Sequence, residues 1–121
     1  MHVNGLAGQM NEINKFHDEA MNLAERAVVA KVKGNLQQAH ELLRKAYENE
    51  ARAAYLLIDV SSPEPTRSVL FRSAASLAID CNELREAEKL IAIGLSGNPP
   101  PDISKELRGM IKSHGRQKES Q

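Results

Sequence analysis

Three polar residues occupy positions where the helical pattern of this sequence favours apolar ones: His17, Glu50 and Arg67. Each falls on a stripe of apolar residues that recur at three- and four-residue steps, as one face of a helix requires. If the chain folds back on itself at Gly34, His17 and Glu50 lie level with each other. An internal repeat, described below, places Arg67 within one turn of that level.

An imidazole, a carboxylate and a guanidinium at one level would form a polar cluster between helices. Such a cluster is able to move protons or to hold a small ligand, because burial and close charges shift the pKa values of these groups. The same three residue types also form plain structural ion pairs in helical interfaces. We therefore treat His17, Glu50 and Arg67 as a structural polar cluster first and as a ligand or catalytic site second.

The elements that would position these residues are helices. Gly34, the Pro63–Pro65 segment, Gly97 and the proline run at 99–101 interrupt the helical pattern. No segment alternates strictly between apolar and polar residues, so no strand is expected. The pattern predicts an all-α domain over residues 9–113, with a flexible leader at 1–8, a disordered tail at 114–121, and helices at 9–33, 36–59, 65–80, 83–96 and 102–113.

The first two helices recur as the next two at an offset of 48 residues. The shared pattern is an apolar residue, an alanine three positions later, and a further apolar pair. It occurs once from Leu36 to Leu43 and again from Leu84 to Ile91. A small residue between larger ones lets two helices of a hairpin pack closely. The repeat predicts two helical hairpins packed side by side.

Ala27, Gly34-Asn35 and Ala39, with Ala75 and Ala87 in the second unit, resemble the tetratricopeptide repeat family. The spacing departs from that family, whose units are roughly 34 residues long. The run 64–78 with the following Pro-Pro-Pro-Asp-Ile is also similar to small uncharacterised bacterial proteins of tetratricopeptide type. The resemblance implies two antiparallel hairpins with a C-terminal capping helix, and it implies no activity.

Charge and motif content narrow the function. The formal net charge is +0, which argues against nucleic acid, and no apolar run reaches the ~18 residues of a membrane span. The single cysteine suits a reducing compartment, so a cytoplasmic location is expected. No metal, phosphate-loop or nucleophile motif is present, so we expect no enzyme activity, no metal and no cofactor.

The leading interpretation is a protein–protein interaction module that acts as an adaptor or scaffold. Stacked hairpins leave a concave surface lined by the first helix of each unit. A protein or peptide partner would bind there, and a homodimer is the alternative within the same class. The candidate partner-binding residues on these helices are Lys15, Glu19, Asn22, Arg26, Arg67 and Arg72.

Two alternatives stay open. Arg67 and Arg72, with nearby hydroxyl side chains at a helix start, would receive an anion such as a carboxylate or a phosphate. A small-ligand-binding protein or enzyme would instead use His17, Glu50 and Arg67. A pocket of ~300 Å³ or more around that cluster would favour the second alternative.

Overall fold

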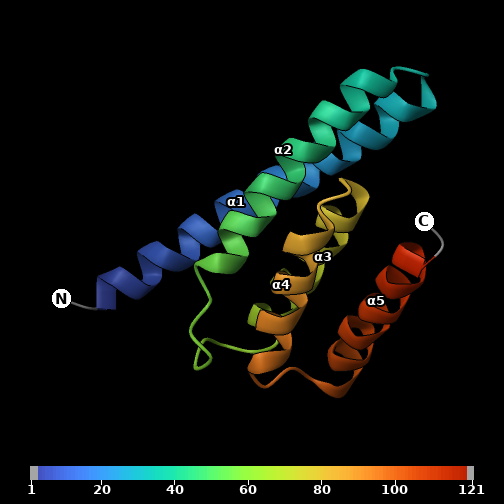
Figure 1. Cartoon of the computed structure of the whole chain (residues 1–121). Coiled ribbons are helices and arrows are strands. Elements are labelled where there is room, and N and C mark those ends of the chain that lie inside the picture. The colour runs from blue at the N-terminus through green and yellow to red at the C-terminus, as the bar shows by residue number, and fades with distance from the viewer. Residues whose placement is uncertain (1–2, 120–121) are drawn as a thin grey trace.

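The computed structural model describes the backbone of residues 3–119 and the side chains of residues 8–112. The described residues form helices and no strand, which confirms the expected all-α class. Figure 1 shows the helices in chain order. They are α1 (Val3–Val32), α2 (Leu36–Tyr55), α3 (Thr66–Asp80), α4 (Leu84–Ser96) and α5 (Pro101–Glu119).

The outer helices are longer than the sequence pattern predicts. α1 covers positions 3–8, where a flexible leader is expected, and α5 covers positions 114–119 of the expected disordered tail. Glycine weakens a helix by only about 1 kcal/mol relative to alanine, and neither segment contains a proline, so a helix is able to continue through both. The remaining terminal positions, 1–2 and 120–121, lie outside the described residues.

α2 ends earlier than predicted, at Tyr55 rather than Asp59. The carbonyl oxygens of Ile58 and Asp59 accept hydrogen bonds from the Arg67 side chain. A long connection then leads to α3 and contains the cis peptide bond between Glu64 and Pro65. The residues just beyond the end of α2 are thus bonded to a side chain of α3.

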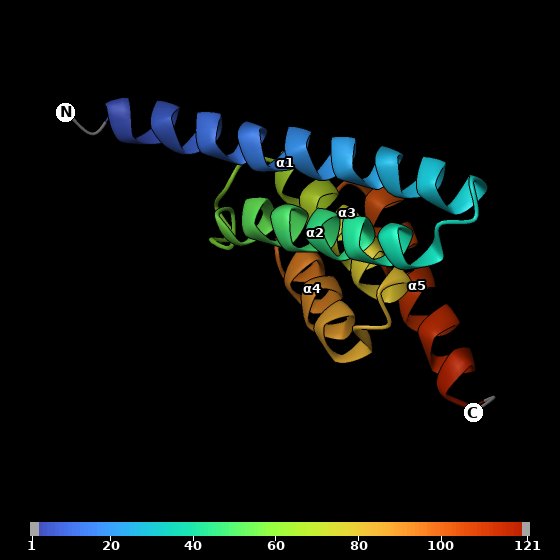
Figure 2. The ribbon, with the colours of Figure 1, turned by 90° about the horizontal axis from the view of Figure 1, so that it is seen from above.

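The helices pack as consecutive neighbours. α1 and α2 lie along each other, α3 packs against both α2 and α4, and α5 lies against α3 and α4. Figures 1 and 2 show the corner between α1 and α2 extending past the other helices. This arrangement leaves α1, α3 and α5 in a row, so they line a common surface.

The two tight corners have the same backbone conformation at equivalent positions. Gly34 has φ +83° and Asn82 has φ +60°, and both lie in the left-handed region that suits glycine and asparagine. The next residue has φ −87° and ψ 72° in the first corner (Asn35) and φ −91° and ψ 68° in the second (Glu83). The two corners thus turn the chain in a similar way, 48 positions apart in the sequence.

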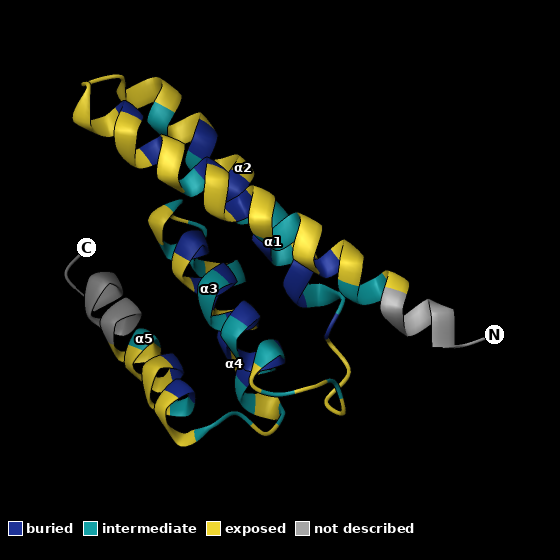
Figure 3. Cartoon of the chain, turned by 180° about the vertical axis from the view of Figure 1, so that it is seen from behind, coloured by how far each residue is buried: buried dark blue, intermediate teal, exposed yellow. Residues whose placement is uncertain are grey.

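Burial is less symmetrical than the backbone. Ala87, Leu90 and Ile91 of α4 are fully buried, and they pack around Phe71 of α3. The equivalent positions of α2 are more exposed, and Leu36 at its start is 57% exposed. The second unit forms the centre of the core, whereas the corner of the first unit is largely exposed to solvent. Figure 3 shows this difference in burial.

Candidate functional site

α1 and α2 bring His17 and Glu50 into direct contact. Nδ1 of His17 lies 2.9 Å from Oε1 and 3.1 Å from Oε2 of the Glu50 carboxylate. Glu50 is fully buried, whereas 34% of the His17 side chain is exposed. One ring nitrogen is therefore held by the carboxylate, and the ring reaches solvent.

Burial raises the pKa of Glu50, and it is the largest influence on that group. Hydrogen bonding and charge from His17 lower the pKa, as does a hydrogen bond with the Ser73 side chain of α3. The net effect is a raised pKa of Glu50. A carboxylate with an imidazole partner is able to orient that imidazole and to exchange a proton with it.

Arg67 does not join this pair. Its guanidinium is fully buried and donates three hydrogen bonds to backbone carbonyl oxygens. Nε donates to Asp59 O at 3.1 Å, Nη1 to Ile93 O at 3.0 Å and Nη2 to Ile58 O at 2.8 Å. The side chain lies on the α4 side of α3, so Ser73 rather than Arg67 is the α3 residue next to Glu50. Arg67 joins the α2–α3 connection to the end of α4.

The same geometry removes Arg67 from the candidate partner-binding residues, because a fully buried side chain cannot touch a partner. Arg72 remains accessible, and its Nη1 lies 3.2 Å from Oε1 of Glu106 on α5. The alternative of an anion bound at the start of α3 is also not supported. Oε1 of Glu64 already accepts a hydrogen bond from the backbone N–H of Ser68 at the start of α3.

The four α1 candidates are exposed, but they do not line the surface shared with α3. Lys15, Glu19, Asn22 and Arg26 all lie on the far side of α1 from that surface. The structure therefore separates the candidates into a buried residue, an ion-paired residue and four residues of one exposed side of α1.

A groove of about 510 Å³ lies between α1, α3 and α5. Its floor and walls are mostly apolar, and the Arg72–Glu106 ion pair lies at its edge. A smaller hollow of about 270 Å³ lies beside His17, where Asn14 and Thr66 add polar groups. The residues that line the groove are Met21, Ala24, Arg72, Ser73, Ser76, Leu77, Glu106 and Met110.

Sequence reasoning identified Arg72 and missed most of this groove. One signal for it was available on α1, where Met21 and Ala24 are three residues apart. Residues with this spacing share one side of a helix. A helix with two apolar sides contacts, or is able to contact, more than one neighbour.

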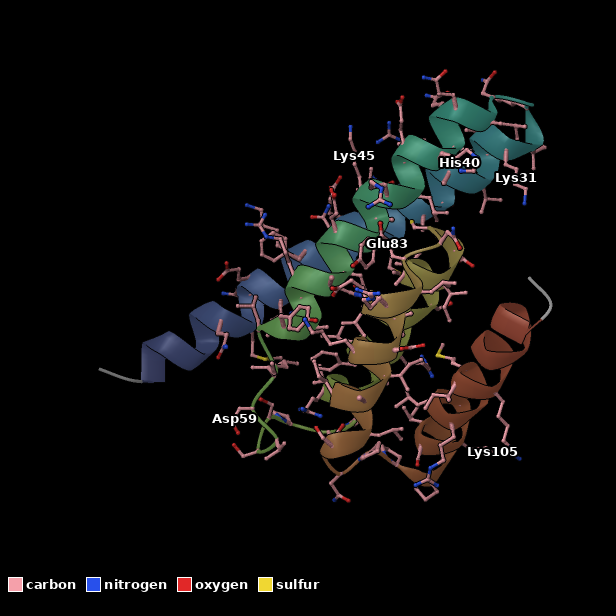
Figure 4. All side chains as sticks on the ribbon, viewed as in Figure 1. Lys31, His40, Lys45, Asp59, Glu83 and Lys105 are labelled. Atoms are coloured by element: carbon pink, nitrogen blue, oxygen red, sulfur yellow. The ribbon has the colours of Figure 1, made fainter. Side chains whose placement is uncertain are left out.

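One exposed ion pair joins the corner between α3 and α4 to α2. Nη2 of Arg44 donates to Oε1 of Glu83 at 2.8 Å, and both side chains are substantially exposed. Figure 4 shows Glu83 at this corner and Lys31 and His40 at the protruding end of α1 and α2. Exposed pairs of this kind add little to stability, because solvent screens the two charges.

Three further observations concern metal binding, membrane-spanning helices and similarity to known proteins. No group of three or more His, Cys, Asp or Glu side chains in the described residues is placed to hold a metal ion. Over the same residues, no helix has both the length and the apolar character needed to cross a membrane. Comparison of the chain with family models, curated proteins and solved structures finds no match.

Proposed function

We propose that this chain is a tetratricopeptide-like interaction module that binds a segment of another protein in the groove between α1, α3 and α5. In this proposal α1–α2 and α3–α4 are two copies of one helical-hairpin repeat, and α5 covers the end of the second copy. The matching backbone of the two corners supports the repeat. The single observation that carries the function is the open groove of about 510 Å³.

The side chains of the groove indicate which segment it would bind. Met21, Leu77 and Met110 supply apolar surface, and methionine adapts its shape to different partners because its side chain is flexible. Arg72 and Glu106 supply one charge of each sign at the edge. An amphipathic helix with an apolar side and polar flanks matches this composition.

Affinity purification from the native cells, followed by mass spectrometry, tests the proposal. Ser76 is exposed and lines the groove, so Ser76→Glu places a charge on the apolar floor without disturbing the core. Gln38→Glu introduces the same charge on an exposed part of α2, away from the groove, and serves as the control. A partner retained by the wild type and by Gln38→Glu, but lost with Ser76→Glu, supports the proposal. Partners that bind all three forms equally contradict it.

The second candidate is a small-ligand-binding protein or enzyme that uses His17 and Glu50. The hollow beside His17 favours it, since Asn14, His17 and Thr66 bring three polar groups to one place. Its volume of about 270 Å³ is at the lower limit for a ligand pocket, which is about 300 Å³. Arg67, the only cation of the expected cluster, lies elsewhere. The interaction module therefore ranks first.

A further inference from the structure

A separate groove of about 660 Å³ is lined by residues of α1 and α2. The chain has two phenylalanines, two tyrosines and no tryptophan, and three of these four aromatic residues line this groove: Phe16, Tyr47 and Tyr55. Tyr47, Ala51 and Tyr55 follow one another at four-residue steps, so they share one side of α2. The small Ala51 leaves a hollow between the two tyrosines. We call this site the aromatic groove.

Two contacts hold aromatic rings of this groove in place. Tyr55 packs edge-on against Phe71 of α3, with the ring centroids 5.9 Å apart and the ring planes at 89°. Arg52 lies over Phe16, with its guanidinium carbon 5.2 Å from the ring centroid. Contacts of this kind favour one orientation of a ring. The aromatic surface of the groove is therefore already ordered in the free chain.

Tyr47 and Tyr55 also bring two hydrogen-bond donors to the groove. Neither hydroxyl has a hydrogen-bond partner within the described residues. Burial raises the pKa of both tyrosines, and the negative charge of Glu86 on α4 raises it further. Both hydroxyls therefore stay protonated at neutral pH, and each is able to donate to a carbonyl oxygen of a partner.

The charge around the aromatic groove is mainly negative. Glu12 and Glu48 line it and are exposed, and Glu86 is close enough to act on both tyrosines. Arg52 also lines the groove, but its guanidinium lies over the face of Phe16. A basic residue of a partner is complementary to this rim.

We propose that the aromatic groove binds a proline-rich segment of another protein, in the polyproline II conformation and with a basic residue beside the prolines. Grooves lined by aromatic side chains accept such segments, because proline rings pack on the aromatic faces. Polyproline II has no internal hydrogen bonds, so its carbonyl oxygens are free to accept from Tyr47 and Tyr55. The carbonyl groups of an α-helix are bonded within the helix, so a helix would leave both hydroxyls unpaired.

The dimensions of the groove match such a segment. Tyr47 and Tyr55 are two four-residue steps apart on α2, which is about 12 Å at 1.5 Å per residue. About four residues of polyproline II cover the same distance at 3.1 Å each. One short segment therefore reaches both tyrosines. Because so short a segment buries little area, the Kd is expected to be on the order of 100 μM.

Heteronuclear NMR titration of the full chain with a synthetic peptide tests the proposal. The peptide has about six prolines followed by one arginine, and it is added to about 2 mM. Replacing Tyr47 and Tyr55 together by phenylalanine keeps both rings and removes both hydroxyls, so the Kd rises about tenfold. Glu48→Lys reverses a charge at the rim and raises the Kd about threefold. Glu25→Lys makes the same charge change on α1 outside the groove, and it leaves the Kd unchanged.

Each outcome supports or overturns the proposal. Saturable shifts around residues 47–55, weakened by the double tyrosine variant, support it. No saturable shift up to about 2 mM overturns it, as does a peptide that binds the double variant and the wild type equally. A peptide with alanine in place of proline that binds as well, or a helical peptide that binds this groove more tightly, overturns the polyproline II conformation. An unchanged Kd in Glu48→Lys overturns the basic residue.

This second interaction surface goes beyond the proposed function. The aromatic groove shares no lining residue with the groove between α1, α3 and α5. The peptide titration and the purification with Ser76→Glu therefore succeed or fail independently of each other.

Discussion

Gly97 lies directly against the guanidinium of Arg67: a Cβ atom at position 97 would be 2.6 Å from Nη1. The chain therefore leaves the end of α4 without a side chain at the point where the buried cation needs room. Glu64 completes this arrangement, because its Oε2 accepts a hydrogen bond from the backbone N–H of Asn98 at 3.2 Å. The α2–α3 connection, the start of α3 and the end of α4 are joined here by polar contacts.

Replacing Arg67 by methionine tests how much this junction stabilises the fold. Methionine fills a similar volume and donates no hydrogen bond, so the carbonyl oxygens of Ile58, Asp59 and Ile93 lose their buried donor. We expect the free energy of unfolding to fall by about 3 kcal/mol or more. Urea unfolding followed by circular dichroism measures it.

Arg72→Met is the matched control for Arg67→Met, since it makes the same change on the same helix. Arg72 is partly exposed and paired with an exposed Glu106. Its loss is expected to cost less than about 1 kcal/mol. Equal costs for the two substitutions would contradict the structural role of Arg67.

Gly97→Ala is expected to destabilise the fold by about 1 to 3 kcal/mol, because the new methyl group displaces the Arg67 guanidinium. Gly109→Ala is the control. A Cβ atom at position 109, within α5, meets nothing within 4 Å, so alanine is expected to raise stability by about 0.5 to 1 kcal/mol. Thermal or urea unfolding of both variants measures whether each substitution lowers or raises the free energy of unfolding. A stabilised Gly97→Ala would be inconsistent with the close approach.

The corners give a third prediction. Gly34→Ala forces an alanine into φ +83°, so the free energy of unfolding is expected to fall by about 1 to 2 kcal/mol. Asn82→Ala, at the equivalent corner, is expected to cost less, because asparagine already bears part of the strain of positive φ. Urea unfolding measures the loss of unfolding free energy in each variant and shows which is larger. No loss at either position would show that the corners do not depend on the left-handed conformation.

Sequence reasoning found the contact between His17 and Glu50 because that contact depends on one local feature, the fold-back at Gly34. It could not place Arg67 correctly, since that required the orientation of α3 relative to helices distant in sequence. The acceptors of Arg67 are backbone carbonyl groups, and no residue type marks them. Met21 of the groove between α1, α3 and α5 was missed for a related reason, because a stronger apolar stripe runs along the same helix.

His17 is expected to hold the pKa of Glu50 lower than burial alone would set it. His17→Ala removes the hydrogen bond and the nearby charge, so the pKa of Glu50 should rise further above its ordinary value of 4.5. Carbon-detected NMR titration of the Glu50 carboxyl group measures the shift. His40→Ala, on an exposed part of α2, is the control and should leave the pKa of Glu50 in place. A lower pKa in His17→Ala would contradict the contact.

Glu50→Gln tests what the buried carboxylate does to stability as the pH changes. Burial raises the pKa of Glu50 in the folded chain, so the folded state binds this proton more tightly than the unfolded state does. The stabilisation from the bound proton is complete below the ordinary pKa of 4.5, and it is lost as the pH rises through the raised value. Glutamine keeps the shape and never ionises. The unfolding free energy of Glu50→Gln, relative to the wild type, is therefore expected to increase across this window in urea titrations. A difference that stays constant with pH would mean that Glu50 ionises as easily in the folded chain as in the unfolded one.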